Sequence, residues 1–346
     1  MTFPFSFDAL AIEQPGSPVS LVKKTIESIT KDEILVRVDY ASINKMDPMM
    51  ARRNLFQLPA PYVLGFDFSG EVVHAGSEGG LKAGDQVFGT AGVGGCFAEY
   101  LVAKKERVVR RGGVPAKEAS TFGIAFLTAY ESLVITGDIR RHQGKTIYIA
   151  GAAGGVGHFA VQIAKLHGLK VIGSAGKAAS LDLLGRLHVD HIVDYSQADV
   201  VREIMKLTGG RGADLVYDST YSQASYNVSA AVVASGGEYI RLGTPMQLTA
   251  FGIEDMTSVV ERRGAKMVIT DCGRYSTDPV YIAQAYKLAA GMKQAVPWYE
   301  EGKLKPVVTQ IVPFAPEPLQ GAFEAFLGGI NNVGKIVVRC TNEGEA

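Results

Sequence analysis

Residues 146–168 read TIYIAGAAGGVGHFAVQIAKLHG. A short apolar run stops at Gly151, and a segment with apolar residues at helical spacing follows the glycines at 154, 155 and 157. Gly168 is a suitable C-terminal cap for that helix. The pattern predicts a strand, a tight glycine turn and a helix. A helix N-terminus approached through glycines offers backbone N–H groups to a diphosphate, so this turn is a candidate dinucleotide site.

The segments that flank the glycine turn continue the alternation of strand and helix. Six β-type runs are separated by helical or turn segments, at residues 146–151, 170–176, 191–195, 213–220, 236–243 and 265–270. Alternating strands and helices predict a parallel sheet. We therefore expect an α/β fold with a doubly wound, Rossmann-type dinucleotide domain over residues 126–279.

A second domain is expected on either side of the first. The 346 residues exceed the size at which one hydrophobic core keeps growing. Short β-type runs with glycine and proline between them occur at 33–41, 69–76, 85–90 and 97–103, and the tail returns to such runs at 307–314 and 334–340. We expect a mostly-β domain over residues 1–125, completed by residues 280–346.

Composition excludes several classes of protein. Lys plus Arg equals Asp plus Glu at 35 each, so no net charge attracts nucleic acid or an anionic membrane. The three cysteines are too few and too widely spaced for a disulfide scaffold or a four-cysteine zinc site. We find no secretory signal and no stretch that approaches the about 20 apolar residues of a membrane span. We expect a cytoplasmic protein with no nucleic-acid or membrane partner.

The end of the second strand bears on the choice of coenzyme. Sites for NAD place an acid there to hold the ribose hydroxyls. This chain has Ser174 and Lys177 instead, with no acid before Asp182. A lysine and a hydroxyl suit a 2′-phosphate, which predicts NADPH over NADH. The alternative is that Lys177 is a solvated loop lysine.

Further strings match a known family in order along almost the whole chain. They are ASINKMD (41–47), YVLGFDFSGEVV (62–73), GDQVFG (84–89), GGCFAEYLV (94–102), the glycine turn, and NVGKIVV (332–338). Together they resemble the zinc-independent medium-chain dehydrogenase/reductases, close to the quinone oxidoreductase (zeta-crystallin-like) group. The resemblance implies a GroES-like β domain at the N-terminus, completed by the tail, with the coenzyme in the cleft between the domains.

The resemblance also implies roles for single residues. Asn44 would hydrogen-bond a carbonyl oxygen or the nicotinamide ribose, and Asp47 is a candidate for positioning, so these two are the predicted catalytic residues. The resemblance also implies that Tyr195 lies near the adenosine 2′-phosphate beside Lys177, that Thr128 faces the nicotinamide end, and that the tail with Asn332, Gly334 and Lys335 closes over the coenzyme. The open alternatives are that Asn44 only lies in a turn, that Tyr195 only ends a strand, and that the hydroxyl of Thr128 bonds back to its own helix. The predicted coenzyme-binding residues are Thr128, Gly151, Ala153, Gly154, Gly155, Val156, Gly157, Ser174, Lys177, Tyr195, Leu242, Gly243, Asn332, Gly334 and Lys335.

No metal site is expected. Zinc-dependent relatives carry a cysteine in the 41–47 region, where this chain has Asn44, and a Gly-His-Glu string where it has Gly65-Phe66-Asp67. Catalytic zinc needs about three protein ligands, and the six histidines show no ligand-type spacing. Without a Lewis acid, the suitable hydride acceptors are quinones and α,β-unsaturated carbonyls.

The proton donor and the physiological role stay open. Some relatives have a tyrosine where this chain has Met49 or Met50, so Tyr62, Tyr275 and solvent are the candidate sources. The leading hypothesis is an NADPH-dependent reductase of small quinones or enones. The alternatives are a 2-enoyl thioester reductase, with a basic groove beginning at Arg52 and Arg53, and a non-catalytic NADPH-binding redox sensor or structural protein. A homodimer through the edge strand 265–270 is also expected.

Overall fold

The computed structural model describes residues 2–78, 80–243, 248–249, 252–273, 278, 281, 284, 286–328 and 333–341. The chain divides into two compact units. Unit 1 comprises Met1–Leu127 and Gly273–Ala346, and unit 2 comprises Thr128–Cys272. The boundaries expected from the sequence, after residues 125 and 279, lie near these two junctions.

Unit 2 is built on six parallel strands. These are β9 (Thr146–Ala150), β10 (Lys170–Ala175), β11 (His191–Asp194), β12 (Ala213–Asp218), β13 (Val233–Leu242) and β14 (Lys266–Thr270). Their order in the sheet is β11-β10-β9-β12-β13-β14, so the chain winds outward in both directions from β9. This order confirms the predicted doubly wound fold. Ligands of such sheets bind at the carboxyl ends of the strands, next to the point where the winding reverses.

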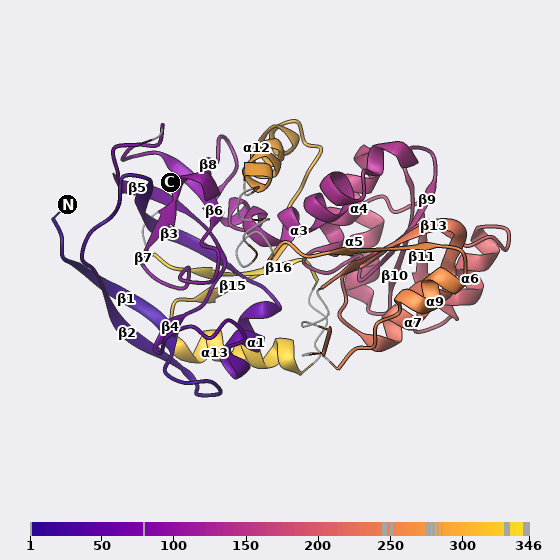
Figure 1. Ribbon diagram of the computed structural model, residues 1–346, viewed down its shortest axis with the longest axis horizontal. Helices are drawn as coiled ribbons and strands as arrows, with labels where there is room; N and C mark the ends of the chain where they lie inside the picture. The colour runs from indigo at the N-terminus through magenta and orange to yellow at the C-terminus, as the bar shows by residue number, and fades with distance from the viewer. Residues whose placement is uncertain are drawn as a thin grey trace. The chain divides into compact units, whose positions relative to one another are not determined.

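Helices cover both faces of this sheet. They are α3 (Leu127–Tyr130), α4 (Gly157–Leu166), α5 (Ala178–Arg186), α6 (Val200–Leu207), α7 (Gln223–Val232) and α9 (Thr257–Arg262), with the short helical turns η3 (Glu131–Thr136) and η4 (Ile139–His142). In Figure 1, α4 and α5 lie on one side of β10 and β11, and α7 and α9 lie on the other. On the side of α7 and α9, Tyr226 and Val260 pack against Tyr239 and Val216 of the strands.

Unit 1 contains the remaining strands. These are β1 (Phe5–Ile12), β2 (Val19–Ile26), β3 (Glu33–Ile43), β4 (Tyr62–Val63), β5 (Asp67–Ala75), β6 (Gln86–Thr90), β7 (Tyr100–Lys104), β8 (Val108–Arg110), β15 (Val308–Pro313) and β16 (Lys335–Arg339). The larger sheet has the order β15-β16-β3-β5-β6-β8, with β7 also paired to β3, and a smaller one has the order β2-β1-β4. The tail thus contributes two strands to the sheet of unit 1.

The register of this sheet brings distant polar residues together. Antiparallel pairing of β3 with β5 sets Ser42 opposite Asp67, and pairing of β3 with β16 sets Ile43 opposite Ile336. Lys335 therefore enters the sheet beside the end of β3. All the strand residues around this point are buried, which leaves any charge there dependent on partners within the protein.

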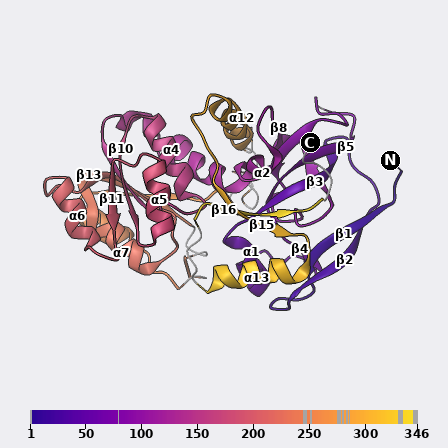
Figure 2. The ribbon, with the colours of Figure 1, turned by 180° about the vertical axis from the view of Figure 1, so that it is seen from behind.

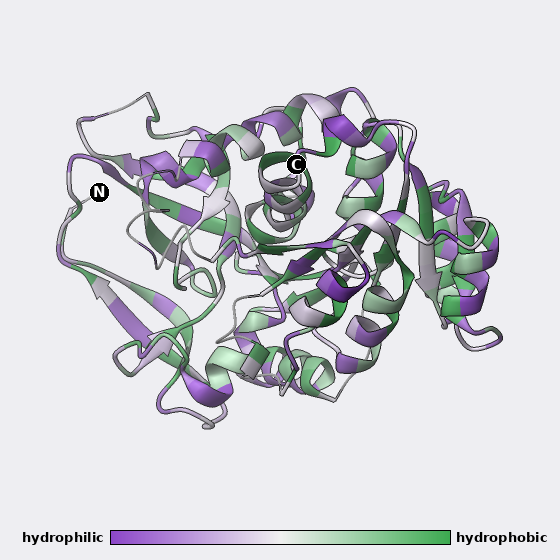
Figure 3. Ribbon diagram, turned by 45° about the vertical axis from the view of Figure 1, so that its right-hand side comes forward, coloured by the Kyte–Doolittle hydropathy of each residue, from purple (hydrophilic) through white to green (hydrophobic). Residues whose placement is uncertain are grey.

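Short helices complete unit 1. They are α1 (Met46–Arg53), η1 (Lys105–Arg107), α2 (Ala116–Ala119), the π-helix η2 (Phe122–Phe126), α12 (Tyr286–Glu300) and α13 (Pro316–Leu327). Seen from behind in Figure 2, α13 runs beside α1 and close to β2, and these elements are in contact. When the ribbon is coloured by hydropathy, the helices alternate between green and purple along their length, as amphipathic helices do (Figure 3).

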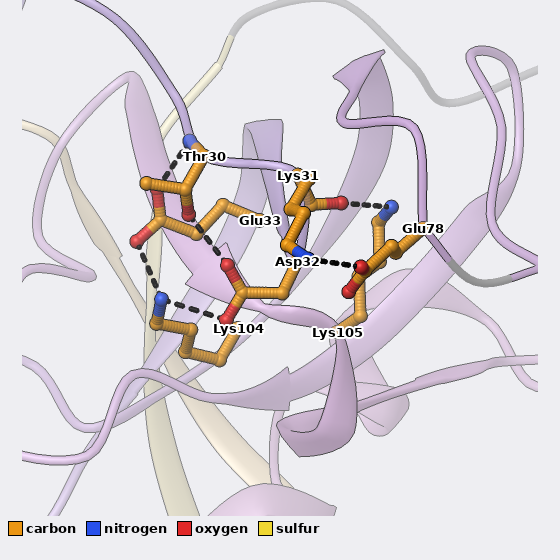
Figure 4. Close-up of polar contacts among 7 residues, drawn as sticks. All are labelled: Thr30, Lys31, Asp32, Glu33, Glu78, Lys104 and Lys105. Atoms are coloured by element: carbon orange, nitrogen blue, oxygen red, sulfur yellow. Dashed lines mark hydrogen bonds and ion pairs between the residues drawn. The ribbon is translucent and has the colours of Figure 1, made fainter.

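A polar cluster ties the start of β3 to the end of β5 (Figure 4). The Nζ atom of Lys105 donates to the carbonyl oxygens of Lys31, at 3.1 Å, and Gly76, at 2.7 Å. Lys104 pairs with the carboxylates of Asp32 and Glu33. The cluster lies at the surface, and its role is to hold two loops of unit 1 together.

One helical run is longer than the sequence analysis anticipated. The elements α2, η2, α3 and η3, with a turn at Ser120 and Thr121, make up a run of 21 residues, Ala116–Thr136, that is long and apolar enough, by length and composition, to cross a membrane. The expectation that no stretch approaches this length was therefore wrong. Within this run, 67% of the apolar window is buried inside the protein, which is the environment of a core helix.

Candidate functional site

The turn between β9 and α4 can be built only with glycine at two positions. Gly151 has a φ of 68°, in the left-handed region that side chains disfavour. A Cβ atom on Gly157 would lie 2.0 Å from the carbonyl oxygen of Gly151. The N–H of Gly154 donates to that same oxygen at 2.9 Å. The glycines therefore allow the first turn of α4 to lie directly against the end of β9.

The N-terminus of α4 is suited to an anion. Its N-cap residue, Val156, makes no side-chain hydrogen bond to the helix. The first N–H groups of a helix lack partners within the helix and carry partial positive charge, which suits a diphosphate. At this turn the N–H groups of His158 and Phe159 already donate to the carbonyl oxygens of Gly154 and Val156, each at 3.1 Å, so the groups from Gly155 to Gly157 remain for the anion. Ala153 is buried beside this turn, whereas Gly154, Gly155 and Val156 are half-buried. These residues fit the diphosphate of a nicotinamide coenzyme.

The end of β10 offers one exposed cation and one aromatic ring. Lys177 is exposed at the start of α5. Tyr195 is 48% exposed, and its ring lies over Gly176, where a Cβ atom would meet ring carbon Cε2 at 2.0 Å. Ser174 is 7% exposed, and its Oγ lies 2.9 Å from the hydroxyl of Tyr148. Lys177 and Tyr195 thus lie at the surface of unit 2, whereas the hydroxyl of Ser174 is buried and paired with Tyr148.

An acid that the sequence analysis did not consider lies at the end of the neighbouring strand. Asp194 of β11 is opposite Ala175 of β10. Its Oδ1 accepts hydrogen bonds from the backbone N–H of Ser196, at 2.9 Å, and from the hydroxyl of Ser196, at 2.7 Å. The carboxylate of Asp194 is therefore held within its own turn.

The ends of β12 and β13 complete the carboxyl edge of the sheet in unit 2. Gly243 has a φ of 100°, and its N–H donates to the carbonyl oxygen of Thr270 at 2.9 Å. The carbonyl oxygen of Leu242 accepts from the hydroxyl of Tyr226 at 3.0 Å. Thr128 lies half-buried in α3. All predicted coenzyme residues up to 243 therefore belong to unit 2, and those at the turn and the strand ends lie along one edge of its sheet.

Asn44 lies in unit 1 at the end of β3, and both the nitrogen and the oxygen of its side-chain amide are hydrogen-bonded. Its Nδ2 donates to Asp67 Oδ1 at 2.8 Å and to the carbonyl oxygen of Ser42 at 3.2 Å. Its Oδ1 accepts from Nζ of Lys335 at 2.7 Å. Asn44 is 8% exposed, so only a small part of this side chain reaches the surface of unit 1.

Asp47 lies in unit 1, where its carboxylate binds backbone groups of the protein. Its two carboxylate oxygens accept from the backbone N–H groups of Asn44, at 2.7 Å, and Gly65, at 2.8 Å. Its side chain is fully buried in the first turn of α1. Burial raises the pKa of Asp47 to about 7, against the two hydrogen bonds, which favour the charged form. Asp47 therefore fastens the loop at Gly65 to α1.

Asp67 was not predicted, yet it is the centre of this cluster. Besides Asn44, its carboxylate accepts from the hydroxyl of Ser42, at 2.8 Å, and from the N–H of Ile124, at 3.0 Å. Burial raises the pKa of Asp67, and the ammonium of Lys335 is the strongest influence in the opposite direction. A charged residue inside the apolar string YVLGFDFSG was the available signal in the sequence.

The structure gives different results for the three predicted coenzyme-binding residues near the C-terminus, Asn332, Gly334 and Lys335. Gly334 has a φ of 62°, and a Cβ atom there would meet the carbonyl oxygen of Val307 at 2.3 Å. The side chain of Lys335 is directed into unit 1, where Nζ also donates to the carbonyl oxygen of Ile43 at 2.8 Å. Asn332, and the proton-donor candidate Tyr275, lie outside the described residues.

The candidate proton donor Tyr62 is already paired. Its hydroxyl donates toward the carbonyl oxygens of Met50, at 3.2 Å, and Ala51, at 3.4 Å. Burial raises its pKa. A tyrosine whose proton is held by the backbone in this way is poorly placed to give it to a substrate.

The described residues contain no group of three or more His, Cys, Asp or Glu side chains placed to hold a metal ion. At the position expected for a zinc-binding histidine, Phe66 is 4% exposed and packs in the hydrophobic core of unit 1. The predicted site thus consists of two parts: a coenzyme edge on unit 2, and a charged cluster in unit 1 made by Asn44, Asp47, Asp67 and Lys335.

Comparisons with known proteins agree with this division. A family described as "Alcohol dehydrogenase GroES-like domain" matches residues 30–115, and one described as "Zinc-binding dehydrogenase" matches residues 155–279. Quinone oxidoreductase of Pongo abelii is 26% identical over 315 residues, which are 90% of each chain. The 2-methylene-furan-3-one reductase of Solanum lycopersicum is 28% identical over 326 residues, covering 90% of this chain and 73% of the relative. The crystal structure of CurK enoyl reductase is similar with a TM-score of 0.81 and 25% identity, over 96% of this chain and 99% of that one.

Proposed function

Because the chain belongs to the zinc-independent, quinone oxidoreductase-type group of the medium-chain dehydrogenase/reductases, we propose that it reduces small quinones or α,β-unsaturated carbonyls with NADPH. Membership makes it an oxidoreductase that uses a nicotinamide coenzyme and a small-molecule substrate. The preference for NADPH and the acceptor class are the proposed part. The observation that carries the proposal is the composition of the strand end at Lys177.

The proposed choice of NADPH rests on the charges around the end of β10. Lys177 is exposed there and supplies one cation for a 2′-phosphate. Two nearby acids are engaged elsewhere: Asp194 in its turn with Ser196, and Asp182 in an ion pair with Arg186 at 3.1 Å. A 2′-phosphate at this edge would therefore meet the cation of Lys177 and the ring of Tyr195, while Arg186 compensates the charge of Asp182 and the carboxylate of Asp194, which keeps its charge, is held in its turn with Ser196.

The residues of unit 2 would hold the coenzyme by different means along its length. The N–H groups at the start of α4 would bind the diphosphate, and Lys177 with Tyr195 would bind the phosphorylated adenosine. The carboxyl ends of β12 and β13 remain for the nicotinamide half, near Leu242 and Gly243. When bound, the coenzyme supplies a hydride. The protein orients both reactants and excludes water, because little covalent chemistry is left for it to perform.

The acceptor class follows from the relatives and from the groups available. The relatives include a quinone oxidoreductase and a reductase of an exocyclic enone. Such acceptors take hydride at carbon while negative charge moves to oxygen, which hydrogen-bond donors can stabilise. Met49 and Met50 lie buried where some relatives have a tyrosine, and Tyr62 is paired with the backbone. We therefore propose that solvent supplies the proton.

A second candidate is reduction of 2-enoyl thioesters. It is supported by the likeness to an enoyl reductase structure. It would require a cationic groove for the phosphopantetheine arm, and Arg52 and Arg53 in the last turn of α1 are its candidate start. A comparison of acceptors separates the two candidates.

Two further features are proposed for the native protein. The strand β14 lies at the edge of the sheet in unit 2, which leaves one side for pairing with a second copy in a homodimer. Light scattering coupled to size exclusion tests this. We also propose a cytoplasmic location, in keeping with which Cys96, Cys272 and Cys340, all among the described residues, form no disulfide bond with one another.

The test of coenzyme choice is the variant Lys177→Glu. We expect it to weaken NADPH binding by one charge-assisted hydrogen bond, about 1.5–3 kcal/mol, plus repulsion, and to leave NADH binding nearly unchanged. Lys170→Glu is the matched control, because Lys170 is exposed at the opposite end of the same strand. Equal NADPH affinity in Lys177→Glu and the wild type would refute the assignment.

The test of the reaction follows NADPH absorbance with 9,10-phenanthrenequinone, a simple enone and crotonyl-CoA. Turnover of the quinone or the enone supports the proposed function, and preference for the thioester supports the second candidate. Tight binding of NADPH without oxidation by any of the three would indicate a non-catalytic NADPH-binding protein.

A further inference from the structure

Of the lysines that the structure describes, only Lys335 is almost completely buried. It is 3% exposed. Its Nζ lies 2.7 Å from Oδ1 of Asn44 and 2.8 Å from the carbonyl oxygen of Ile43. Burial lowers the pKa of Lys335, while the nearby carboxylates of Asp67 and Asp47 raise it. Removal of an ammonium group from water is costly, which indicates that the burial of Lys335 serves a role in the protein.

The contact with Lys335 fixes which way the amide of Asn44 points. An ammonium only donates hydrogen bonds, so the amide atom beside it must be the oxygen. At the other end of the amide, the carboxylate of Asp67 only accepts, so the atom beside it must be the nitrogen. A cation and an anion on opposite sides therefore exclude the flipped amide.

The same contacts determine what Asn44 can still bind. Its two amide hydrogens are used by Asp67 and by the carbonyl oxygen of Ser42. Its oxygen uses one lone pair for Lys335 and keeps a second. Asn44 can thus accept one more hydrogen bond and donate none.

We propose that Lys335 is a positioning residue that holds the amide of Asn44 as a hydrogen-bond acceptor for the nicotinamide half of the coenzyme. The inference rests on the proposed function. The nicotinamide ribose and carboxamide carry O–H and N–H donors, which suit a free amide oxygen. The carbonyl oxygen of a quinone or enone needs a donor, and Asn44 has none left to give.

This role differs from a direct contact between Lys335 and a coenzyme phosphate. Such a contact would require Nζ to leave Asn44 and Ile43 and to reach the surface of unit 1. Asp67 and Asp47 oppose that movement, because they would lose their nearest cation. The two roles can be separated with 2′,5′-ADP, which carries coenzyme phosphates but lacks the nicotinamide half.

The experiment compares Lys335→Met, Lys335→Gln, Asn44→Ala and the double variant Lys335→Met/Asn44→Ala. Glutamine keeps a neutral donor for Asn44 and serves as a second variant if the methionine variant does not fold. Lys105→Met is the matched control, since Lys105 also donates to two oxygens, at the polar cluster of Figure 4. Thermal unfolding, binding of NADPH and of 2′,5′-ADP, and kcat/KM with the quinone are measured for each.

For Lys335→Met we expect about tenfold weaker NADPH binding, a similar or larger fall in kcat/KM, and unchanged 2′,5′-ADP binding. Lys335→Gln should recover most of the loss. In the double variant, NADPH affinity and kcat/KM should match those of Asn44→Ala within about twofold, since Lys335 acts through Asn44. Lys105→Met should lower the unfolding temperature and leave binding and turnover unchanged.

Additive losses in the double variant, or weaker binding of 2′,5′-ADP by Lys335→Met, would overturn the positioning role. Either result would leave the proposed function intact if the wild-type enzyme still reduces its acceptor. A lower unfolding temperature with unchanged NADPH binding would overturn the positioning role as well. If the wild type oxidises NADPH with none of the acceptors tested, the proposed function fails. The NADPH affinities of Lys335→Met, Asn44→Ala and the double variant would then still test whether Lys335 acts through Asn44.

Discussion

Replacing Gly157 by alanine tests the glycine turn at its tightest point. The new Cβ atom would lie 2.0 Å from the carbonyl oxygen of Gly151 and 2.9 Å from Cα of Ala152. Both contacts are with backbone, so no side chain can rotate away. To reach even the shortest normal contact, α4 must move from β9 by roughly 1 Å, a displacement that close-packed interiors resist.

The expected loss of coenzyme affinity follows from that movement. Hydrogen bonds from the first N–H groups of α4 to a diphosphate require donor–acceptor distances of about 2.7–3.2 Å, and a shift of roughly 1 Å breaks this range. The loss of one charge-assisted bond costs about 1.5–3 kcal/mol, which weakens NADPH binding by about 10- to 150-fold. Overpacking should also lower the free energy of unfolding by about 1–3 kcal/mol.

Calorimetric titration with NADPH and chemical denaturation measure the two effects. Gly185→Ala is the matched control, because Gly185 lies within α5 and a Cβ atom there has nothing within 4 Å. We expect this control to gain about 0.5–1 kcal/mol of stability and to bind NADPH normally. If Gly157→Ala binds NADPH within about twofold of the wild type, the diphosphate does not lie at this turn.

Two other predictions concern buried charges. Asp255→Ala should lower the free energy of unfolding by about 1–3 kcal/mol in urea denaturation, because the fully buried Arg241 loses its ion pair at 3.0 Å with Asp255, whose own side chain is 55% exposed. Adding Arg241→Met should recover most of that loss, and failure to do so would contradict the argument. Burial raises the pKa of Asp47 to about 7 in the folded state, above its unfolded value of about 3.9, so its burial should lower stability as pH rises from about 4 to 7. In Asp47→Asn this part of the pH dependence should disappear, and an unchanged slope would show that Asp47 is not its source.

The fold of unit 2 could be predicted from local signals. The glycine turn required a strand before it and a helix after it, and α4 begins at Gly157, the last glycine of the turn. The hairpin of β1 and β2 in unit 1 was not predicted. Along β2 the residues alternate between inward and outward, but Lys23 and Lys24 interrupt the apolar pattern in the sequence. The strand expected at 97–103 begins only at Tyr100.

The helix α13 shows a signal that was present but not used. Pro316 stands at its first position, where proline favours a helix start, and Leu319, Ala322 and Phe323 follow at helical spacing on the buried side. The π-helix η2 had no such signal, because its geometry depends on contacts made elsewhere in unit 1. The carboxylate of Asp67, for example, accepts from the N–H of Ile124.

The two parts of the candidate site also differ in how far the sequence could predict them. Residues of the glycine turn could be identified because their constraint is local: Gly157 meets Gly151, six positions earlier. The environment of Asn44 could not, because it depends on strand register. Asp67 comes from β5 and Lys335 from the far end of the chain, and both reach Asn44 only through pairing with β3.

The two parts of the site also differ in what will disturb them. The diphosphate turn of unit 2 is made of backbone groups, so added volume, as at Gly157, should harm it more than a nearby change of charge. The cluster in unit 1 is made of Asp47, Asp67 and Lys335 around one amide, so a change of charge should harm it even when volume is preserved. Under the proposed function, the turn of unit 2 would supply affinity for the coenzyme and the cluster of unit 1 would hold the amide of Asn44 in one orientation. Variants of the first kind should therefore act mainly on coenzyme binding, and variants of the second kind on turnover as well.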